Sequence, residues 1–151
     1  MLKEIHNYLS LTKSIATAGQ PSEGQIAAIA ENGYEVVVNL GLADAEYALD
    51  NEEAVVWAHG MQYIHLPVIW ERPTHSDLEQ FFMVMETNKN KKMFVHCAAN
   101  MRVSVFMALY RVLRLGWSEE KAFEQVKRIW VPNDVWQTFI DEILEQDNSD
   151  S

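Results

Sequence analysis

The stretch that decides the fold of this chain is Lys92-Met-Phe-Val-His-Cys97-Ala-Ala-Asn-Met-Arg102-Val-Ser104. Residues 92–96 form a short apolar run typical of a buried strand, and residues 104–115 carry apolar side chains at the spacing of a helix. The small residues between them therefore link a strand to a helix N-terminus, where backbone N–H groups converge and favour an anion. We predict an anion-binding loop that begins at Cys97.

Two side chains of this loop suggest its chemistry. A cysteine beside an arginine at a helix N-terminus favours the thiolate form, which makes Cys97 a candidate nucleophile. The guanidinium of Arg102 offers several N–H donors to an oxyanion. The alternatives are a buried structural thiol at Cys97 and a surface residue at Arg102. A cation near a helix N-terminus is unfavourable unless an anion binds there, which favours a ligand role for Arg102.

Patterns outside this stretch alternate between strand and helix. We predict strands at residues 14–18, 35–40, 62–66 and 92–96, and helices at 22–32, 46–59, 74–87, 104–115, 118–130 and 134–145. Two of the helix starts have the spacing of a capping box: Ser22 with Gln25, and Thr74 with Asp77. The alternation predicts an α/β fold with a mostly parallel central sheet flanked by helices on both faces, and Cys97 at the carboxyl end of a strand.

Composition limits the function classes. The 151 residues suit one domain (residues 1–151), with a core over roughly 14–145 and an acidic tail at 146–151. The net charge of −10 argues against nucleic acid and acidic membrane surfaces as partners. One cysteine excludes an internal disulfide, and the five histidines lack metal-ligand spacing, so we expect no metal and no cofactor. The start of the chain lacks an apolar signal core, so we expect a cytoplasmic protein.

Three blocks resemble a known superfamily: Ala18–Pro21 leading into Glu35–Leu40, then Tyr63–Val68, then Val95–Ser104. They resemble the cysteine-dependent protein tyrosine and dual-specificity phosphatases, and most closely a bacterial phosphatase-like family of unknown function. The resemblance implies a dual-specificity-phosphatase-like fold. It also implies hydrolysis of a phosphomonoester, on a protein or a small molecule, through a phosphocysteine intermediate.

The resemblance also implies roles for individual residues. Cys97 would be the nucleophile and Arg102 would bind the oxyanion, while Glu71, in the loop after the third strand, would be the general acid. Residues expected to bind the phosphate are Ala98, Ala99, Asn100, Met101, Arg102 and Val103. Supporting roles are expected for His96, Ser104 and Asp77. The alternative for Ser104 is a helix N-cap, and the alternative for Asp77 is the capping box.

The spacing departs from the common pattern of these phosphatases. Most carry five residues between the cysteine and the arginine, whereas four separate Cys97 from Arg102. An ungapped alignment places Val103 on the arginine position, so we expect a loop one residue shorter in which Arg102 does this work. Asn100 replaces a glycine of the loop, and asparagine tolerates positive φ better than most residues.

Two other functions remain open from the sequence. One is a pseudophosphatase, a loop that binds phosphate or another oxyanion without turnover. The other is a rhodanese-like sulfurtransferase that carries a persulfide on Cys97, because rhodanese loops often have an arginine in the sixth position counted from the cysteine. His96 and the three C-terminal helical segments favour the phosphatase.

Overall fold

A five-stranded sheet forms the centre of the protein in the computed structural model, which describes residues 1–150. The strands are β1 (Leu9–Ser10), β2 (Ile15–Ala18), β3 (Val36–Asn39), β4 (Gln62–His65) and β5 (Met93–His96). Their order in the sheet is β1-β2-β5-β3-β4. Only β1 and β2 pair antiparallel, and all other neighbours are parallel. The predicted mostly parallel sheet is therefore confirmed.

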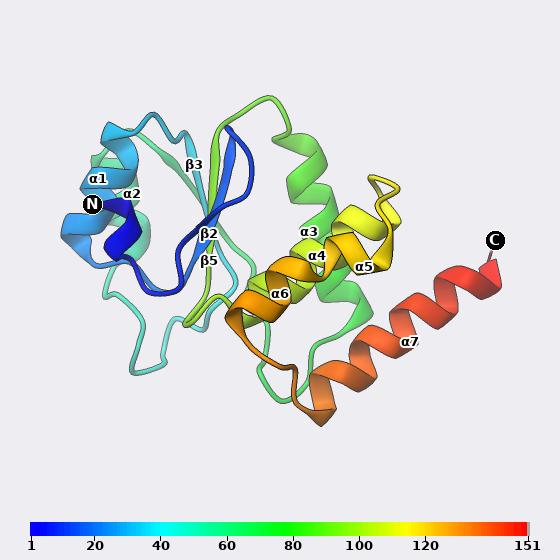
Figure 1. Cartoon of the computed structure of the whole chain (residues 1–151). Coiled ribbons are helices and arrows are strands. Elements are labelled where there is room, and N and C mark those ends of the chain that lie inside the picture. Colours follow the sequence, from blue (N-terminus) through cyan, green and yellow to red (C-terminus); the bar gives the residue numbers. More distant parts are fainter. Residues whose placement is uncertain (151) are drawn as a thin grey trace.

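Helices cover both faces of this sheet. They are the 3-10 helix η1 (Leu2–Glu4) and the α-helices α1 (Glu23–Glu31), α2 (Glu52–Ala58), α3 (His75–Thr87), α4 (Met101–Leu113), α5 (Glu119–Ala122), α6 (Glu124–Ile129) and α7 (Asp134–Asp150). Helices α1 and α2 lie on one side together with the N-terminus, and α3 to α7 lie on the other (Figure 1). Within residues 1–150, no helix is both long and apolar enough to cross a membrane.

The central strands are apolar because both faces of the sheet are buried. Consecutive side chains of a strand point to opposite faces. Accordingly Val36 and Val38 belong to the core cluster shared with α3, α4, α6 and α7, whereas Val37 and Phe94 belong to the cluster beneath α1 and α2. A run of three buried valines is thus what a parallel strand between two helical layers requires.

Register places the carboxyl ends of four strands at one edge. Ala18 of β2 and Asn39 of β3 are both paired with His96 of β5, and His65 of β4 is paired with Asn39. The loops that follow these residues leave the sheet together, and the loop after β5 begins with Cys97. This is the edge at which open parallel sheets bind ligands.

The helix starts at Ser22 and Thr74 confirm the capping boxes. The side chain of each residue accepts a hydrogen bond from the N–H group three residues later, and the side chains of Gln25 and Asp77 accept one in return. Because Asp77 makes this reciprocal bond, the structure supports its capping role.

Three of the predicted helices differ from those in the structure. The helix predicted at 46–59 begins only at Glu52, because residues 43–51 form turns and Asn51 has a φ of 54°. The helix predicted at 118–130 is interrupted at Phe123, between α5 and α6. The helix predicted at 134–145 continues to Asp150, through most of the segment predicted to be an acidic tail; Ser151 lies outside the described residues.

The structure excludes the alternative role of Ser104 as a helix N-cap. Helix α4 begins at Met101, and its N-cap is Asn100, so Ser104 lies inside the helix. The helix starts earlier than predicted because Asn100 adopts the left-handed conformation that ends the loop.

Candidate active site

A cavity of about 180 Å³ lies over the start of α4. Its lining consists of Trp70, Cys97, Ala98, Ala99, Met101 and Arg102. Cys97 and Arg102 are 1% and 5% exposed, so both residues line the floor of this cavity with little of their surface open to solvent. The structure therefore brings together the predicted nucleophile, the predicted arginine and three more of the predicted phosphate-binding residues. A larger cavity of about 340 Å³, between α5, α6 and α7, contains no cysteine.

The Cys97 loop (residues 97–102) turns carbonyl oxygens toward neighbouring segments. The oxygen of Ala98 accepts a hydrogen bond from the N–H of Gln20 (3.0 Å), and the oxygen of Ala99 accepts one from Nδ2 of Asn7 (2.9 Å). Within residues 1–150, several backbone N–H groups at this turn donate to no other group: those of Ala98, Ala99, Met101, Arg102 and Val103. Free N–H groups that converge at a helix start are donors for an anion.

Gly19 allows the loop to approach the segment after β2. A Cβ atom at this position would lie 2.6 Å from the oxygen of Ala98, and the backbone of Gly19 forms an isolated bridge with Ala99. No larger residue fits here without moving the loop. The segment Ala18–Pro21, which resembles the phosphatases in sequence, thus supports the Cys97 loop.

Asn100 confirms the expected tolerance of positive φ, because its φ is 65°. Its buried side chain donates hydrogen bonds to the backbone oxygen of Asn7 (2.9 Å) and to Oγ1 of Thr17 (3.0 Å). The amide thus ties the loop to β2 and to the N-terminal segment. Its side chain is not part of the cavity lining.

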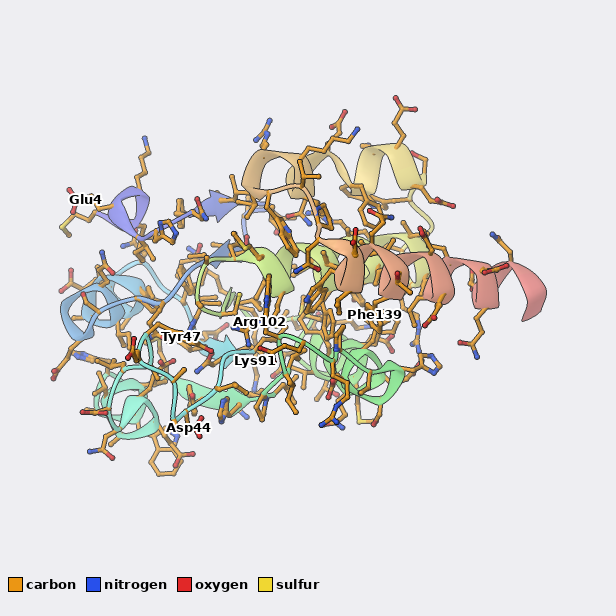
Figure 2. The ribbon with its side chains drawn as sticks, turned by 90° about the horizontal axis from the view of Figure 1, so that it is seen from below. Glu4, Asp44, Tyr47, Lys91, Arg102 and Phe139 are labelled. Atoms are coloured by element: carbon orange, nitrogen blue, oxygen red, sulfur yellow. The ribbon has the colours of Figure 1, made fainter. Side chains whose placement is uncertain are left out.

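Arg102 is held by two acceptors outside the Cys97 loop. Its Nη1 atom donates to the backbone oxygen of Val68 (2.7 Å), and its Nη2 atom donates to the Oη atom of Tyr47 (3.1 Å). The guanidinium also lies 5.7 Å from the ring centre of Trp70. An arginine has five N–H donors, so three remain for a bound anion. The labelled side chains of Tyr47 and Arg102 lie next to each other in Figure 2.

His96 connects Cys97 to a buried carboxylate. Its Nε2 atom lies 2.6 Å from Oε2 of Glu52, and its Nδ1 atom lies 3.3 Å from the backbone oxygen of Cys97. Both partners are acceptors once Glu52 is ionised, so both hydrogen bonds form together only when both ring nitrogens carry hydrogen. His96 therefore lies between the Cys97 loop and Glu52 and links the two.

The carboxylate of Glu52 is ionised for a physical reason. Burial would raise its pKa, but hydrogen bonds from His96 and from Nε2 of Gln20 (2.8 Å) together with the charge of His96 outweigh burial, and the pKa lies below its ordinary value of 4.5. The side chains of Glu52 and His96 are thus a buried, hydrogen-bonded pair.

The remaining predicted residues do not line the cavity. Glu71 is exposed on the turn at 69–72, next to Trp70. Val103 is buried in the core. The hydroxyl of Ser104 donates to the backbone oxygen of Met101 (2.7 Å) and accepts from Nε1 of Trp130 (3.2 Å). No three His, Cys, Asp or Glu side chains of the described chain gather as ligands for a metal ion.

Reasoning from the sequence missed Glu52 and Tyr47. Both lie in the range 46–59, which was predicted to be one amphipathic helix, and nothing in the pattern distinguishes Glu52 from its exposed neighbour Glu53. The contact between Glu52 and His96 becomes apparent only when α2 is placed against the end of β5.

Comparison with known proteins points to one family. Residues 5–137 match the family described as "DSP-PTPase phosphatase fused to NAD+ Kinase". A "Beta-lactamase hydrolase-like protein" of Xylella fastidiosa is 27% identical over 108 residues, which are 70% of this chain and 25% of the relative. The chain therefore spans about a quarter of that relative's length.

Solved structures share the whole fold. A protein of Shewanella putrefaciens CN-32, described as "Putative phosphatase (DUF442)", superposes with a TM-score of 0.87 at 28% identity, over 96% of this chain and 95% of the other. A cysteine-to-serine form of TpbA from P. aeruginosa, solved in complex with pTyr, superposes with a TM-score of 0.66 at 17% identity, over 80% and 72% of the two chains. At that identity the second likeness concerns the fold alone.

Proposed function

We propose that this chain, which belongs to the DSP-PTPase phosphatase family matched by residues 5–137, hydrolyses a phosphomonoester with Cys97 as its nucleophile. The observation that carries the proposal is that Cys97 and Arg102 line one cavity, in a loop with several unpaired backbone N–H groups. A thiolate attacks phosphorus, and N–H donors with a guanidinium stabilise the charge of the equatorial oxygens in the transition state. Each part is present in the Cys97 loop.

The first step transfers the phosphoryl group to the protein. The Sγ atom of Cys97 attacks phosphorus, an S–P bond forms, and the bond from phosphorus to the ester oxygen breaks. The three equatorial oxygens are held by the loop N–H groups and by Arg102. The departing oxygen takes a proton from a carboxyl group, a role we assign to Glu71 because Trp70, its neighbour in the chain, lines the cavity.

The second step regenerates the thiolate. Water attacks phosphorus while the carboxylate of Glu71 takes one of its protons, and the S–P bond breaks. Inorganic phosphate leaves, and the electron pair of the S–P bond returns to Cys97. The ring of His96, which contacts the backbone oxygen of Cys97, holds that residue in place in both steps. The reaction needs neither a metal nor an organic cofactor.

The test uses an activated ester, para-nitrophenyl phosphate. Wild type should release nitrophenol, and Cys97→Ser should abolish the release while circular dichroism shows an unchanged fold. Arg102→Lys should lower kcat/KM by about 10²-fold, because an ammonium group cannot reproduce the paired contacts of a guanidinium. Equal activity of Cys97→Ser and wild type would refute the proposal. Sulfur transfer from thiosulfate to cyanide, without hydrolysis, would assign the rhodanese-like activity instead.

One observation favours a second candidate, a phosphate-binding pseudophosphatase. Among the residues that the structure describes, no carboxylate lines the cavity, so a proton donor for the leaving oxygen is not in place there. A protein of this kind would bind inorganic phosphate at the Cys97 loop and hydrolyse neither an activated nor an unactivated ester. Isothermal titration of wild type with phosphate, beside the hydrolysis assay, separates the two candidates.

A further inference from the structure

We propose that Tyr47 is the positioning residue of Arg102, fixing the plane of its guanidinium so that the remaining N–H donors meet a bound oxyanion. This inference rests on the proposed function, because it concerns how the same site binds its oxyanion. It assigns a role to Tyr47, for which the sequence pattern predicted only a place in a helix at 46–59.

The first observation is that the phenol oxygen of Tyr47 accepts two hydrogen bonds. The Oη atom of Tyr47 accepts a hydrogen bond from the N–H of Leu42 (2.8 Å) and another from Nη2 of Arg102 (3.1 Å). A phenol oxygen has two lone pairs, and both are used here. The bond to Leu42 closes the turn at 42–47, so the atom that receives Arg102 is fixed by its own backbone.

The second observation is that this turn is attached to the sheet. The N–H of Gly41 donates to Oδ1 of Asn39 (2.7 Å), and the oxygen of Gly41 contacts Nε2 of His65 (2.6 Å). Asn39 and His65 are the last residues of β3 and β4. A Cβ atom at Gly41 would lie 3.0 Å from Cε1 and 3.1 Å from Oη of Tyr47, so the absence of a side chain lets the phenol pack here. The Oη atom of Tyr47 is therefore held in a fixed position relative to β3 and β4.

The third observation concerns what the guanidinium would do without this contact. Arg102 has two anchors, the oxygen of Val68 on Nη1 and the phenol of Tyr47 on Nη2. Two acceptors on two nitrogens define a plane, whereas one acceptor leaves the group free to rotate about that contact. Since bidentate binding of an oxyanion needs a defined plane, loss of the phenol should weaken oxyanion binding without removing any group that touches the substrate.

The primary test is Tyr47→Phe, which keeps the ring and removes only the hydroxyl. We expect kcat/KM for para-nitrophenyl phosphate to fall about tenfold, and the inhibition constant of vanadate to rise by a similar factor, as for loss of a hydrogen bond to a charged group. The matched control is Tyr110→Phe, a tyrosine of α4 that belongs to the core cluster and does not line the cavity. The control should change both quantities less than twofold. Equal effects of the two variants would overturn the inference.

A double-mutant cycle separates positioning from a loosened loop. If Tyr47 acts through Arg102, then Tyr47→Phe in an Arg102→Lys background should change kcat/KM and vanadate binding by less than twofold. If the two losses multiply, Tyr47 acts independently of Arg102 and the inference is wrong. Should wild type lack any hydrolysis that depends on Cys97, the proposed function fails, but the same four proteins still test the inference through their vanadate affinities.

Discussion

The Nε2 atom of His96 lies 2.6 Å from Oε2 of Glu52, with both side chains buried. This contact joins the first residue of α2 to the residue immediately before Cys97. The hydrogen-bonded pair of His96 and Glu52 is thus part of the support of the Cys97 loop. Its removal should change both the stability of the protein and the pH dependence of that stability.

Glu52→Gln should lower the free energy of unfolding at pH 7 by about 2–3 kcal/mol, because the buried His96 loses a charged partner. The folded pKa of Glu52 lies below its ordinary value of 4.5, so the unfolded chain binds more protons as the pH falls through that value. The stabilisation is fully present above the ordinary value and is lost as the pH falls below it. Urea unfolding of both proteins at several pH values should show the difference shrinking below pH 4.5, and a difference independent of pH would contradict this account.

Cys97 should react with iodoacetamide in the folded protein, and phosphate or vanadate should protect it. The thiol lines the cavity, and an anion held by the loop N–H groups would cover it. Mass spectrometry of the alkylated protein measures the rate. Protection should disappear in Arg102→Ala, which loses the guanidinium. A thiol that reacts only after urea is added would indicate a structural cysteine.

Gly19→Ala should destabilise the protein by about 1–3 kcal/mol, since the added methyl group would meet the oxygen of Ala98 at 2.6 Å. Gly24→Ala is the matched control, because Gly24 lies in α1 with nothing within 4 Å of the added atom. The control should be neutral or stabilising by up to about 1 kcal/mol. Thermal unfolding of the two variants measures the contrast, and similar melting temperatures would show that the loop tolerates a side chain at position 19.

Glu71→Gln should slow hydrolysis of phenyl phosphate by about 10²-fold and that of para-nitrophenyl phosphate far less, because nitrophenolate leaves without a proton. Glu120→Gln, which changes an exposed glutamate of α5, serves as the control. Rates over a series of aryl phosphates give the dependence on the leaving group. An equal loss for all esters would remove Glu71 as the general acid.

Much of the fold could be predicted from the sequence because its signals are local. The strand at Val36–Asn39 follows from its apolar run, and the capping boxes at Ser22 and Thr74 fix the starts of two helices. Strand β1 was missed because Leu9–Ser10 has only two residues and depends on pairing with β2. The start of α2 was misplaced because the bond from Leu42 to Tyr47 stabilises a turn where helix spacing alone predicts a helix.

The candidate site was predictable only in the part that is contiguous in the chain. Cys97 and Arg102 lie in one short loop, so their spacing is visible in the sequence. Glu52 and Tyr47 reach that loop through tertiary contacts with His96 and Arg102. No periodicity encodes such contacts, and one sequence therefore cannot identify them.

The support of the Cys97 loop by Gln20 and Asn7 has a consequence for folding kinetics. Asn7 and Ala99 are 92 positions apart in the chain, and the loop also needs β2 to pair with β5. Contacts between such distant segments form slowly, because the intervening chain must first be ordered. The Cys97 loop should therefore reach its final conformation only when the N-terminal segment packs against it, late in folding. During refolding, vanadate binding should appear after chain collapse and helix formation. The ability to bind vanadate should therefore be the last property that the folding protein acquires.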